Sequence, residues 1–440
     1  MTVSRNDLLI VGAGAAGLMA SVAAVEAGLS AITLERRHRA GLKLLMCGNN
    51  RCNITHHASA AEMLEAYGEP VASFLRRAVE TFPPEALRAW FARNGLRTIV
   101  QRDRVYPATE NADDVLHCFL DRMRELAAPL ALNCAVAHLE HQDSGFVVVT
   151  EGGLAFQAAN VLVATGGVSY PKTGSVGDGQ RMASELNLKV TPLRPGLAGI
   201  DSDAPWLREL REPADIPEVA IAILEGEQEV GRTTGNILCS GNGILRGSAI
   251  FDATRLAAHH SLRNMRLLVD FAPDWSAQDL QRRCDVVHGA RETAELLDKL
   301  GLPPSVSDAL VSTLRLPLSA RMLKSFPLPV VAIRPLKEAI VTVGGVDLSE
   351  IDPDTMQSRR IPGLYFAGEV MDVDGPTGGY NLHAAFATAK LAVAAVARSI
   401  SPQAGRERMP LPSRRKPSPS NTPPATRQWK RPAKPQSWYR

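Results

Sequence analysis

The sequence predicts an α/β protein built on a Rossmann-like domain that binds a dinucleotide. Two observations carry this prediction: a glycine-rich strand–turn–helix near the N-terminus, and a late apolar strand that leads into an alanine-rich helix. The chain has 440 residues, of which 45% are hydrophobic and 22% charged. This composition is ordinary for a globular protein, and the length allows two or three domains.

The first motif is DLLIVGAGAAGLMASVAAVEAGLSAITLERR, residues 7–37. Its apolar start predicts a buried strand over residues 7–11, and its small residues predict a helix over residues 15–27. A second short strand is expected over residues 31–34, with Glu35 at its end. Strand, glycines, helix, strand and acid in this order predict a dinucleotide site, which a lone GxGxxG would not.

Gly12, Gly14 and Gly17 supply the GxGxxG spacing of the turn. Gly12 is expected to make the tight turn, Gly14 to let the backbone approach a pyrophosphate, and Gly17 to allow close packing of helix and strand. The helix N-terminus offers unpaired N–H groups to phosphate. Glu35 is placed to accept hydrogen bonds from the ribose hydroxyls.

The later motif indicates that the dinucleotide is FAD. A buried strand over residues 161–164 ends in ATGG, and IPGLYFAGEVMD, residues 361–372, is a further strand with acids at its end. PTGGYN then leads into a helix over residues 382–397. A glycine–acid strand end that feeds a helix is typical of proteins that hold the ribityl chain and pyrophosphate of FAD. The dipole of that helix would stabilise the anionic reduced flavin.

Together these motifs resemble the BaiN/RdsA-type flavoproteins, the YhiN-like family of NAD(P)/FAD-dependent oxidoreductases. The resemblance covers roughly residues 5–400 and rests on four segments and the spacing between them. The segments are VGAGAAGLMAS, GNNRCNIT, LVATGGVSYPKTGSVGDG and RPLKEAIVTVGGVDLSEIDPDTMQSRRIPGLYFAGEVMDVDGPTGGYN.

The resemblance implies a discontinuous Rossmann-like FAD-binding domain over residues 1–190 and 335–400. An inserted β-barrel and helical substrate domain would occupy residues 191–334, in which residues 219–233 and 265–273 alternate like strands. Residues 278–301 and 305–316 are expected to be helices.

The expected FAD-binding residues come from the motifs and from the resemblance. They are Gly12, Gly14, Ala15, Ala16, Gly17, Glu35, Arg36, Lys43, Arg51, Asn53, Val136, Thr165, Gly166, Gly368, Glu369, Asp372, Gly378, Gly379, Tyr380 and Asn381. Tyr380 and His383 are the candidate catalytic acids, although an Asn-Leu-His at a helix start also suits packing or capping. The histidines show no metal-ligand spacing, so no metal is expected.

Cys47 and Cys52 raise a second possibility, a redox pair of a flavin disulfide reductase. Such reductases carry a second GxGxxG domain for NADPH, and the chain has no second strand–GxGxxG–helix. In the family the segment usually reads SGGGRCN, so Cys52 matches a family position and Cys47 does not. Lining of the cofactor is therefore the favoured role of this segment.

The inserted region departs from the family at residues 237–251, ILCSGNGILRGSAIF. Gly243 and Gly247 match the family pattern, whereas Cys239 and Ser240 replace a Thr-His pair and Arg246 adds a cation. An arginine there would suit an anionic substrate group, and a surface arginine on a turn is the alternative.

Two functions from different classes follow. The first is an oxidoreductase with hydride transfer through FAD to or from a small organic substrate, with NAD(P)H or the substrate as donor; the resemblance implies enone reduction or aminoacetone oxidation. The second is a flavin-containing binding or regulatory protein that contacts nucleic acid.

The C-terminal tail is the feature that favours a nucleic-acid contact. Residues 401–440 hold ten Lys or Arg, one Glu and nine Pro, which predicts a disordered basic tail. No apolar run is long enough for a membrane span, and the N-terminus lacks a signal-like segment. A cytoplasmic protein without a membrane partner is expected, and its oligomeric state is left open.

Overall fold

The computed structural model describes residues 5–260, 265–314 and 317–400. The described residues form one compact unit. The C-terminal tail and residues 315–316 of a predicted helix lie outside the described residues.

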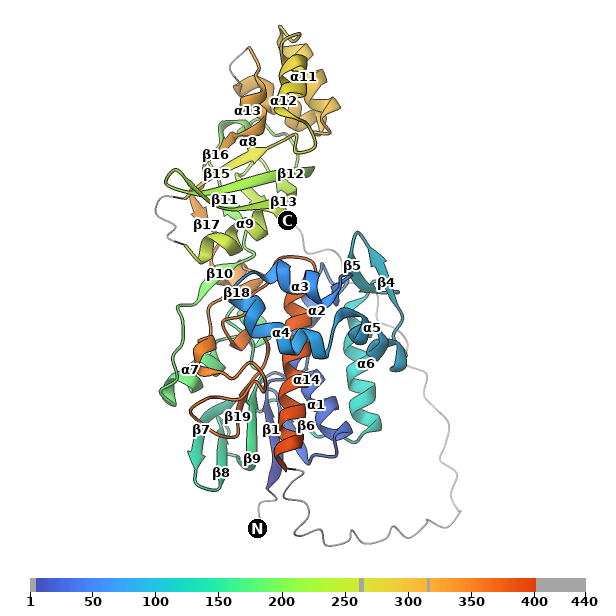
Figure 1. The fold of residues 1–440 in the computed structure, drawn as a ribbon, viewed down its shortest axis with the longest axis vertical. Helices are drawn as coiled ribbons and strands as arrows, with labels where there is room; N and C mark the ends of the chain where they lie inside the picture. The colour runs from blue at the N-terminus through green and yellow to red at the C-terminus, as the bar shows by residue number, and fades with distance from the viewer. Residues whose placement is uncertain (1–4, 261–264, 315–316, 401–440) are drawn as a thin grey trace. The chain divides into compact units, whose positions relative to one another are not determined.

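A seven-stranded sheet forms the base of the first domain (Figure 1). Its strands run in the order β6-β2-β1-β9-β8-β7, with β19 also paired to β9. They are β1 Asn6–Val11, β2 Ala31–Leu34, β6 Leu130–Ala131, β7 Val136–Gln142, β8 Gly145–Thr150, β9 Ala155–Val163 and β19 Leu364–Phe366. β6, β2, β1, β9 and β19 are parallel, whereas β9, β8 and β7 form an antiparallel meander. The apolar run of β1 is expected for a strand covered on both faces.

Helices rich in small residues pack against one another beside this sheet. The helices of this domain are α1 Ala15–Glu26, α2 Leu42–Met46, α3 Ala60–Tyr67, α4 Val71–Thr81, α5 Pro84–Arg93, α6 Ala112–Glu125, α7 Asp178–Glu185 and α14 Tyr380–Ile400. α1 packs against α14, far apart in sequence but side by side in Figure 1.

Short elements complete the first domain. The strands β3 Thr55–His56, β5 Arg104–Pro107 and β4 Thr98–Gln101 form a small antiparallel sheet. The 3₁₀ turns are η1 Pro171–Thr173, η3 Leu336–Glu338, η4 Leu348–Glu350 and η5 Gly368–Val370. β10 Arg194–Gly196 pairs with β18 Val341–Val343. These two strands are the segments through which the chain enters and leaves the inserted region.

The inserted region has its own hydrophobic cluster, with members from Ile200 to Leu328, separate from the cluster of the first domain. Its sheet has the order β16-β15-β12-β13-β14-β11-β17. These strands are β11 Ile200–Asp201, β12 Ala214–Glu225, β13 Gln228–Cys239, β14 Ile244–Arg246, β15 Met265–Asp270, β16 Phe326–Leu328 and β17 Ala332–Ile333. Among the described strands, β16 and β17 do not pair with each other, so the sheet is open where the resemblance implied a closed barrel.

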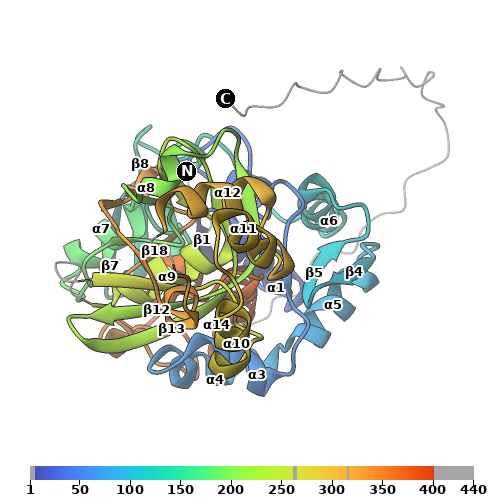
Figure 2. The same ribbon diagram turned by 90° about the horizontal axis from the view of Figure 1, so that it is seen from above.

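The helices of the inserted region are α8 Pro205–Arg208, α9 Ser248–Ala258, α10 Ala277–Cys284, α11 Ala290–Lys299, α12 Pro304–Thr313 and α13 Ala320–Lys324. α11 and α12 pack side by side, as both ribbon views show (Figure 2). The helix expected over residues 278–301 is broken between α10 and α11, where Gly289 precedes the second helix. The strand expected over residues 219–233 is a hairpin, because Gly226 turns the chain in the left-handed region.

Candidate functional site

A cavity opens at the carboxyl ends of β1 and β2. Ligands of open α/β sheets bind at this end of the strands. Seven of the predicted cofactor-binding residues line the cavity: Gly12, Gly14, Glu35, Arg36, Lys43, Val136 and Thr165. The first strand–helix–strand unit therefore supplies most of the predicted residues that the structure brings together.

The three motif glycines occupy different surroundings. A Cβ on Gly12 would lie 2.6 Å from the carbonyl oxygen of Ala164, and one on Gly17 would lie 1.8 Å from the carbonyl oxygen of Gly12. A Cβ on Gly14 would meet no atom within 4 Å. The wall at Gly14 is thus open for a phosphate group, whereas Gly12 and Gly17 are needed for packing.

Glu35 fixes the turn that borders the cavity. Its Oε2 accepts a hydrogen bond from the backbone N–H of Ala13 at 2.8 Å, and its Oε1 accepts one from the N–H of Arg37 at 2.8 Å. Each carboxylate oxygen can accept a further bond. Glu35 can therefore hold the turn and still bind ribose hydroxyls.

Arg36 and Arg39 stand at the cavity, and each is paired with an acid. Arg36 contacts Asp178, which also lines the cavity, and Arg39 Nη2 lies 2.6 Å from Asp113 Oδ1. Asp178 is the first residue of α7 and was not among the predicted site residues. The two pairs balance charge beside a site that would receive phosphate.

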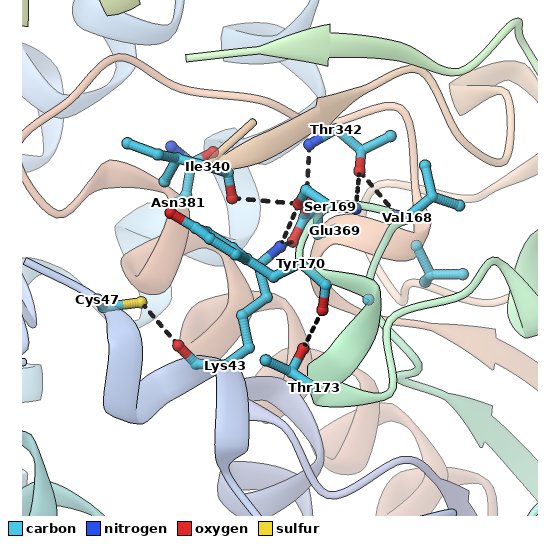
Figure 3. A network of polar contacts seen from close by, with 12 residues as sticks. Lys43, Cys47, Val168, Ser169, Tyr170, Thr173, Ile340, Thr342, Glu369 and Asn381 are labelled. Carbon is cyan, nitrogen blue, oxygen red and sulfur yellow. Dashed lines mark hydrogen bonds and ion pairs between the residues drawn. The ribbon is translucent and has the colours of Figure 1, made fainter. Parts of the chain in front are cut away.

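Lys43 and Glu369 form an ion pair, and Figure 3 shows the polar network around them. Lys43 Nζ lies 2.5 Å from Glu369 Oε2 and donates to Ser169 Oγ at 2.7 Å. Glu369 Oε1 accepts from the Thr342 N–H at 2.8 Å and from Ser169 Oγ at 3.1 Å. The network ties four separate segments together, and Lys43 connects it to the cavity that it lines.

Among the buried polar atoms of the described residues that lack a hydrogen-bond partner, two belong to predicted cofactor-binding residues near the cavity and the glycines before α14. Thr165 Oγ1 belongs to a cavity-lining residue, and Asn53 Oδ1 lies beside Gly379. Buried polar groups are normally satisfied. The open wall at Gly14, the free acceptor capacity of Glu35 and these two atoms fit the polar groups of FAD.

The remaining predicted cofactor-binding residues lie outside the cavity, and their role stays a prediction. They are Ala15, Ala16, Gly17, Arg51, Asn53, Gly166, Gly368, Glu369, Asp372, Gly378, Gly379, Tyr380 and Asn381. The guanidinium of Arg51 pairs with Glu110 at 3.1 Å and stacks on Tyr106 of β5. Its positive charge is therefore already paired with an acid of the protein. Asp372 accepts from Thr191 Oγ1 at 2.8 Å and from the Gly344 N–H at 3.0 Å.

Residues 374–379 form what we call the glycine loop, which leads into α14. Gly378 and Gly379 have φ of 115° and 97°, and a Cβ on Gly379 would lie 2.6 Å from the backbone of Thr55. Asn381 closes the loop by accepting from the Gly375 N–H at 2.9 Å and donating to the Gly375 carbonyl at 2.8 Å. The loop is therefore a tightly fitted backbone turn that tolerates no side chain at Gly379.

Tyr380 stacks on His56, with ring centroids 4.9 Å apart and planes inclined by 24°. Tyr67 donates its hydroxyl to the Tyr380 carbonyl at 2.7 Å, and His56 Nδ1 lies 3.2 Å from the Gly378 carbonyl. Burial raises the pKa of Tyr380, with added effects of Asp252, Glu62 and Asp103, so its phenol keeps its proton at neutral pH.

His383 is 0% exposed, and its Nδ1 lies 3.0 Å from Thr55 Oγ1. Burial lowers the pKa of His383 to about 4. A neutral, fully enclosed imidazole favours the packing alternative over catalysis.

Sequence reasoning missed several residues that the structure places at the site. They are His56, Tyr67, Ser169, Thr342 and Asp178, together with Cys134, which lines the cavity. Asp178 could have been found, because it follows Gly177 at a helix start near ATGG. The others lie in segments whose approach depends on the folded chain.

The cysteine pair does not have the properties of a redox couple. Within the described residues both thiols are free, and Cys47 Sγ donates to the Lys43 carbonyl. Burial raises the pKa of Cys47 to about 11 and raises that of Cys52 as well. A thiolate is the attacking species in disulfide exchange, so the structure does not support this alternative.

The residues that depart from the family in the inserted region form hydrogen bonds at the end of β13 or lie on the short strand β14. Cys239 Sγ donates to the Ala214 carbonyl, and Ser240 Oγ donates to Asn242 Oδ1 at 2.6 Å. Arg246 is the exposed last residue of β14 and does not line the cavity.

Comparison with known proteins identifies the family of the chain. The family model described as the HI0933-like protein Rossmann domain matches residues 6–395. The chain belongs to the HI0933-like Rossmann family. The prediction of an FAD-dependent oxidoreductase of the BaiN/RdsA type is thereby confirmed.

Two curated relatives match along almost their whole length. The chain is 29% identical over 417 residues to the 3-dehydro-bile acid delta(4,6)-reductase of Clostridium scindens, covering 89% of this chain and 99% of the relative. It is 27% identical over 409 residues to the ribosomal RNA dihydrouridine synthase of Escherichia coli, covering 88% and 97%.

A solved structure shares the fold. The 3-ketosteroid-delta4-(5alpha)-dehydrogenase of Rhodococcus jostii RHA1 aligns with a TM-score of 0.50 at 14% identity, covering 89% of this chain and 97% of that chain. In the part of the chain that the structure describes, no helix is long and apolar enough to cross a membrane. The same residues contain no group of three or more potential metal ligands.

Proposed function

We propose that the chain is an FAD-dependent reductase of carbon–carbon double bonds conjugated with a carbonyl group. The observation that carries this proposal is what the names of its two relatives have in common. One name describes the reduction of double bonds at positions 4 and 6 of a 3-oxo bile acid, and the other describes dihydrouridine, in which a conjugated double bond of uridine is saturated. The enone-reduction hypothesis from the sequence names the same chemistry.

The cavity at β1 and β2 suits the adenosine and pyrophosphate end of FAD. Gly14 and the N-terminus of α1 would face the pyrophosphate, and Glu35 would bind the ribose. FAD, when bound, supplies hydride transfer. Lys43 adds a cation at the edge of the cavity, held in place by Glu369 and Ser169.

Tyr380 is our candidate for the residue that supplies a proton to the carbon next to the substrate carbonyl. Its phenol is protonated at neutral pH, and its backbone and ring are held by Tyr67 and His56. Saturation of a double bond needs one hydride and one proton, so a positioned acid beside the flavin completes the reaction.

The electron donor in this proposal is NADH or NADPH, bound transiently. The chain has no second strand–GxGxxG–helix, which supports a donor that binds and leaves by the same face as the substrate. A substrate that itself reduces the flavin is the alternative.

A small organic enone is the substrate class that we favour. Uridine in RNA is a second candidate, supported by the rRNA relative and by ten Lys or Arg against one Glu in residues 401–440. A basic tail would raise affinity for RNA in a salt-dependent manner.

Anaerobic stopped-flow absorbance tests the proposal. The purified protein is reduced with NADH or NADPH and then mixed with a steroid enone or with a uridine-containing RNA. We expect the flavin band to bleach with the nicotinamide and to return with one of the two acceptors. A flavin that is reduced but reoxidised only by oxygen would overturn the proposed reaction. A flavin that nicotinamide never reduces would shift the donor to the substrate.

A further inference from the structure

Helix α9 of the inserted region contacts the glycine loop through the polar side chains of one face. Asp252, Arg255 and His259 are spaced by three and four residues, so they share a side of the helix end. Each contacts residue 374 or residue 377 of the loop. The inserted region thus touches the loop that precedes Tyr380 through three polar side chains.

Asp252 binds Thr377 twice. Its Oδ1 accepts from the Thr377 N–H at 2.6 Å, and its Oδ2 accepts from the Thr377 hydroxyl at 2.8 Å. Both carboxylate oxygens are used on a single residue. This pair of bonds fixes the position and the rotation of the peptide that leads into Gly378.

Arg255 and Asp374 form a buried ion pair. Arg255 is 7% exposed and Asp374 is 1% exposed, and Arg255 Nη1 donates to Asp374 Oδ2 at 3.0 Å. His259 Nε2 lies 3.1 Å from Asp374 Oδ1. Burying such a pair adds little net stability, but separating the two groups would leave an uncompensated buried charge, so the pair holds the loop against α9.

The opposite side of the loop is held by the first domain. His56 Nδ1 lies 3.2 Å from the Gly378 carbonyl, and Asn381 bonds both backbone groups of Gly375. Gly378 and Gly379 carry no side chains of their own that could fix the turn. The loop conformation therefore depends on contacts from outside it, and α9 provides the buried charged ones.

We propose that Asp252 and Arg255 are positioning residues of the flavin site, which hold the glycine loop and Tyr380 in the geometry needed for hydride transfer. They line no part of the cavity, so they act through residues 374–377. This inference rests on the proposed function in placing the flavin beside Gly378, Gly379 and Tyr380. It makes the seating of the inserted region a condition for catalysis.

Hydrogen exchange of the loop, read by mass spectrometry, tests the contact itself. The variants are Asp252→Asn, Thr377→Val and the two combined, all close in volume to the native residues. We expect amide exchange in peptides that cover residues 374–380 to rise by about tenfold in each single variant. The double variant is expected to add little, because both changes act on the same contact: Asp252→Asn removes the charge of the acceptor, and Thr377→Val removes the hydroxyl that donates to it.

The flavin supplies the second readout. In the holoenzyme, Asp252→Asn is expected to slow the step that reoxidises the flavin by about tenfold, while FAD affinity changes by less than about threefold. Arg255→Met is expected to act in the same direction more strongly, and the Asp252 and Thr377 variants keep the test open if Arg255→Met does not fold.

Lys324→Met is the matched control. Lys324 Nζ pairs with the buried Asp270 at 2.7 Å in the inserted region, away from the loop. Its loss also leaves a buried carboxylate without its cation, yet exchange of residues 374–380 should not change.

Unchanged loop exchange in Asp252→Asn and Thr377→Val, or an equal rise in Lys324→Met, would overturn the inference. The exchange measurement does not need a substrate. A protein that fails to reduce enones would therefore contradict the proposed function. The contact between α9 and the loop would still be tested by the hydrogen-exchange measurement.

Discussion

The cavity at β1 and the glycine loop are both built around left-handed glycines, but they are held in different ways. Gly17 and Glu35 make their contacts within one continuous stretch of about thirty residues, and Gly12 also packs against Ala164 at the end of the neighbouring strand. The glycine loop is held by His56 from one domain and by Asp252 and Arg255 from the inserted region. The turn of the cofactor cradle is thus largely local, whereas the glycine loop depends on distant segments.

The largest expected effect comes from Gly17→Ala. The new Cβ would lie 1.8 Å from the Gly12 carbonyl oxygen, so α1 and β1 must separate. We expect a loss of about 3 kcal/mol or more in the free energy of unfolding, measured by urea denaturation.

Gly289→Ala is the control, because a Cβ there meets nothing within 4 Å and the φ of −144° is ordinary. Equal stability of the two variants would contradict the packing role of Gly17.

Tyr380→Phe tests the reacting end of the site. The ring keeps its stack on His56 but loses the acidic proton. We expect kcat to fall by roughly 100-fold, the size of a general-acid contribution, with FAD binding retained. Turnover that is unchanged with the same enone substrate would remove Tyr380 from the mechanism.

Contacts that are local in sequence could be predicted from the sequence, whereas contacts between distant segments could not. The elements of the first strand–helix–strand unit agree with prediction to within one residue, because their apolar and small residues encode them locally. Lys43 and Glu369 were both predicted, but not as partners of each other, since 326 positions separate them.

The inserted region shows why the rest could not be read. A turn at Gly226 and a break before Gly289 divide segments that the hydrophobic pattern presents as continuous. The contacts between α9 and the glycine loop join residues more than a hundred positions apart, so no local sequence pattern predicts them.

Gly14→Ala separates cofactor binding from folding. Its Cβ would project into open space where we place the pyrophosphate. We expect FAD affinity to fall by about tenfold, roughly 1.4 kcal/mol, while the unfolding free energy of the FAD-free protein changes by less than about 1 kcal/mol. Fluorescence titration and urea denaturation measure the two quantities. Unchanged FAD affinity would place the pyrophosphate elsewhere.

The smallest effect is expected for Cys47→Ser. The thiol only donates to the Lys43 carbonyl, and its raised pKa leaves little thiolate. Flavin turnover should stay within about twofold of the native rate. Complete loss of turnover with bound flavin retained would restore the disulfide hypothesis.

The most direct measurement is an equilibrium titration of the flavin-free protein with FAD, followed by flavin fluorescence and compared with Gly14→Ala. We expect saturation at one FAD per chain, with weaker binding in the variant. Absence of any FAD binding by the native chain, under conditions where it is folded, would contradict the central claim that the cavity at β1 and β2 is the cofactor site.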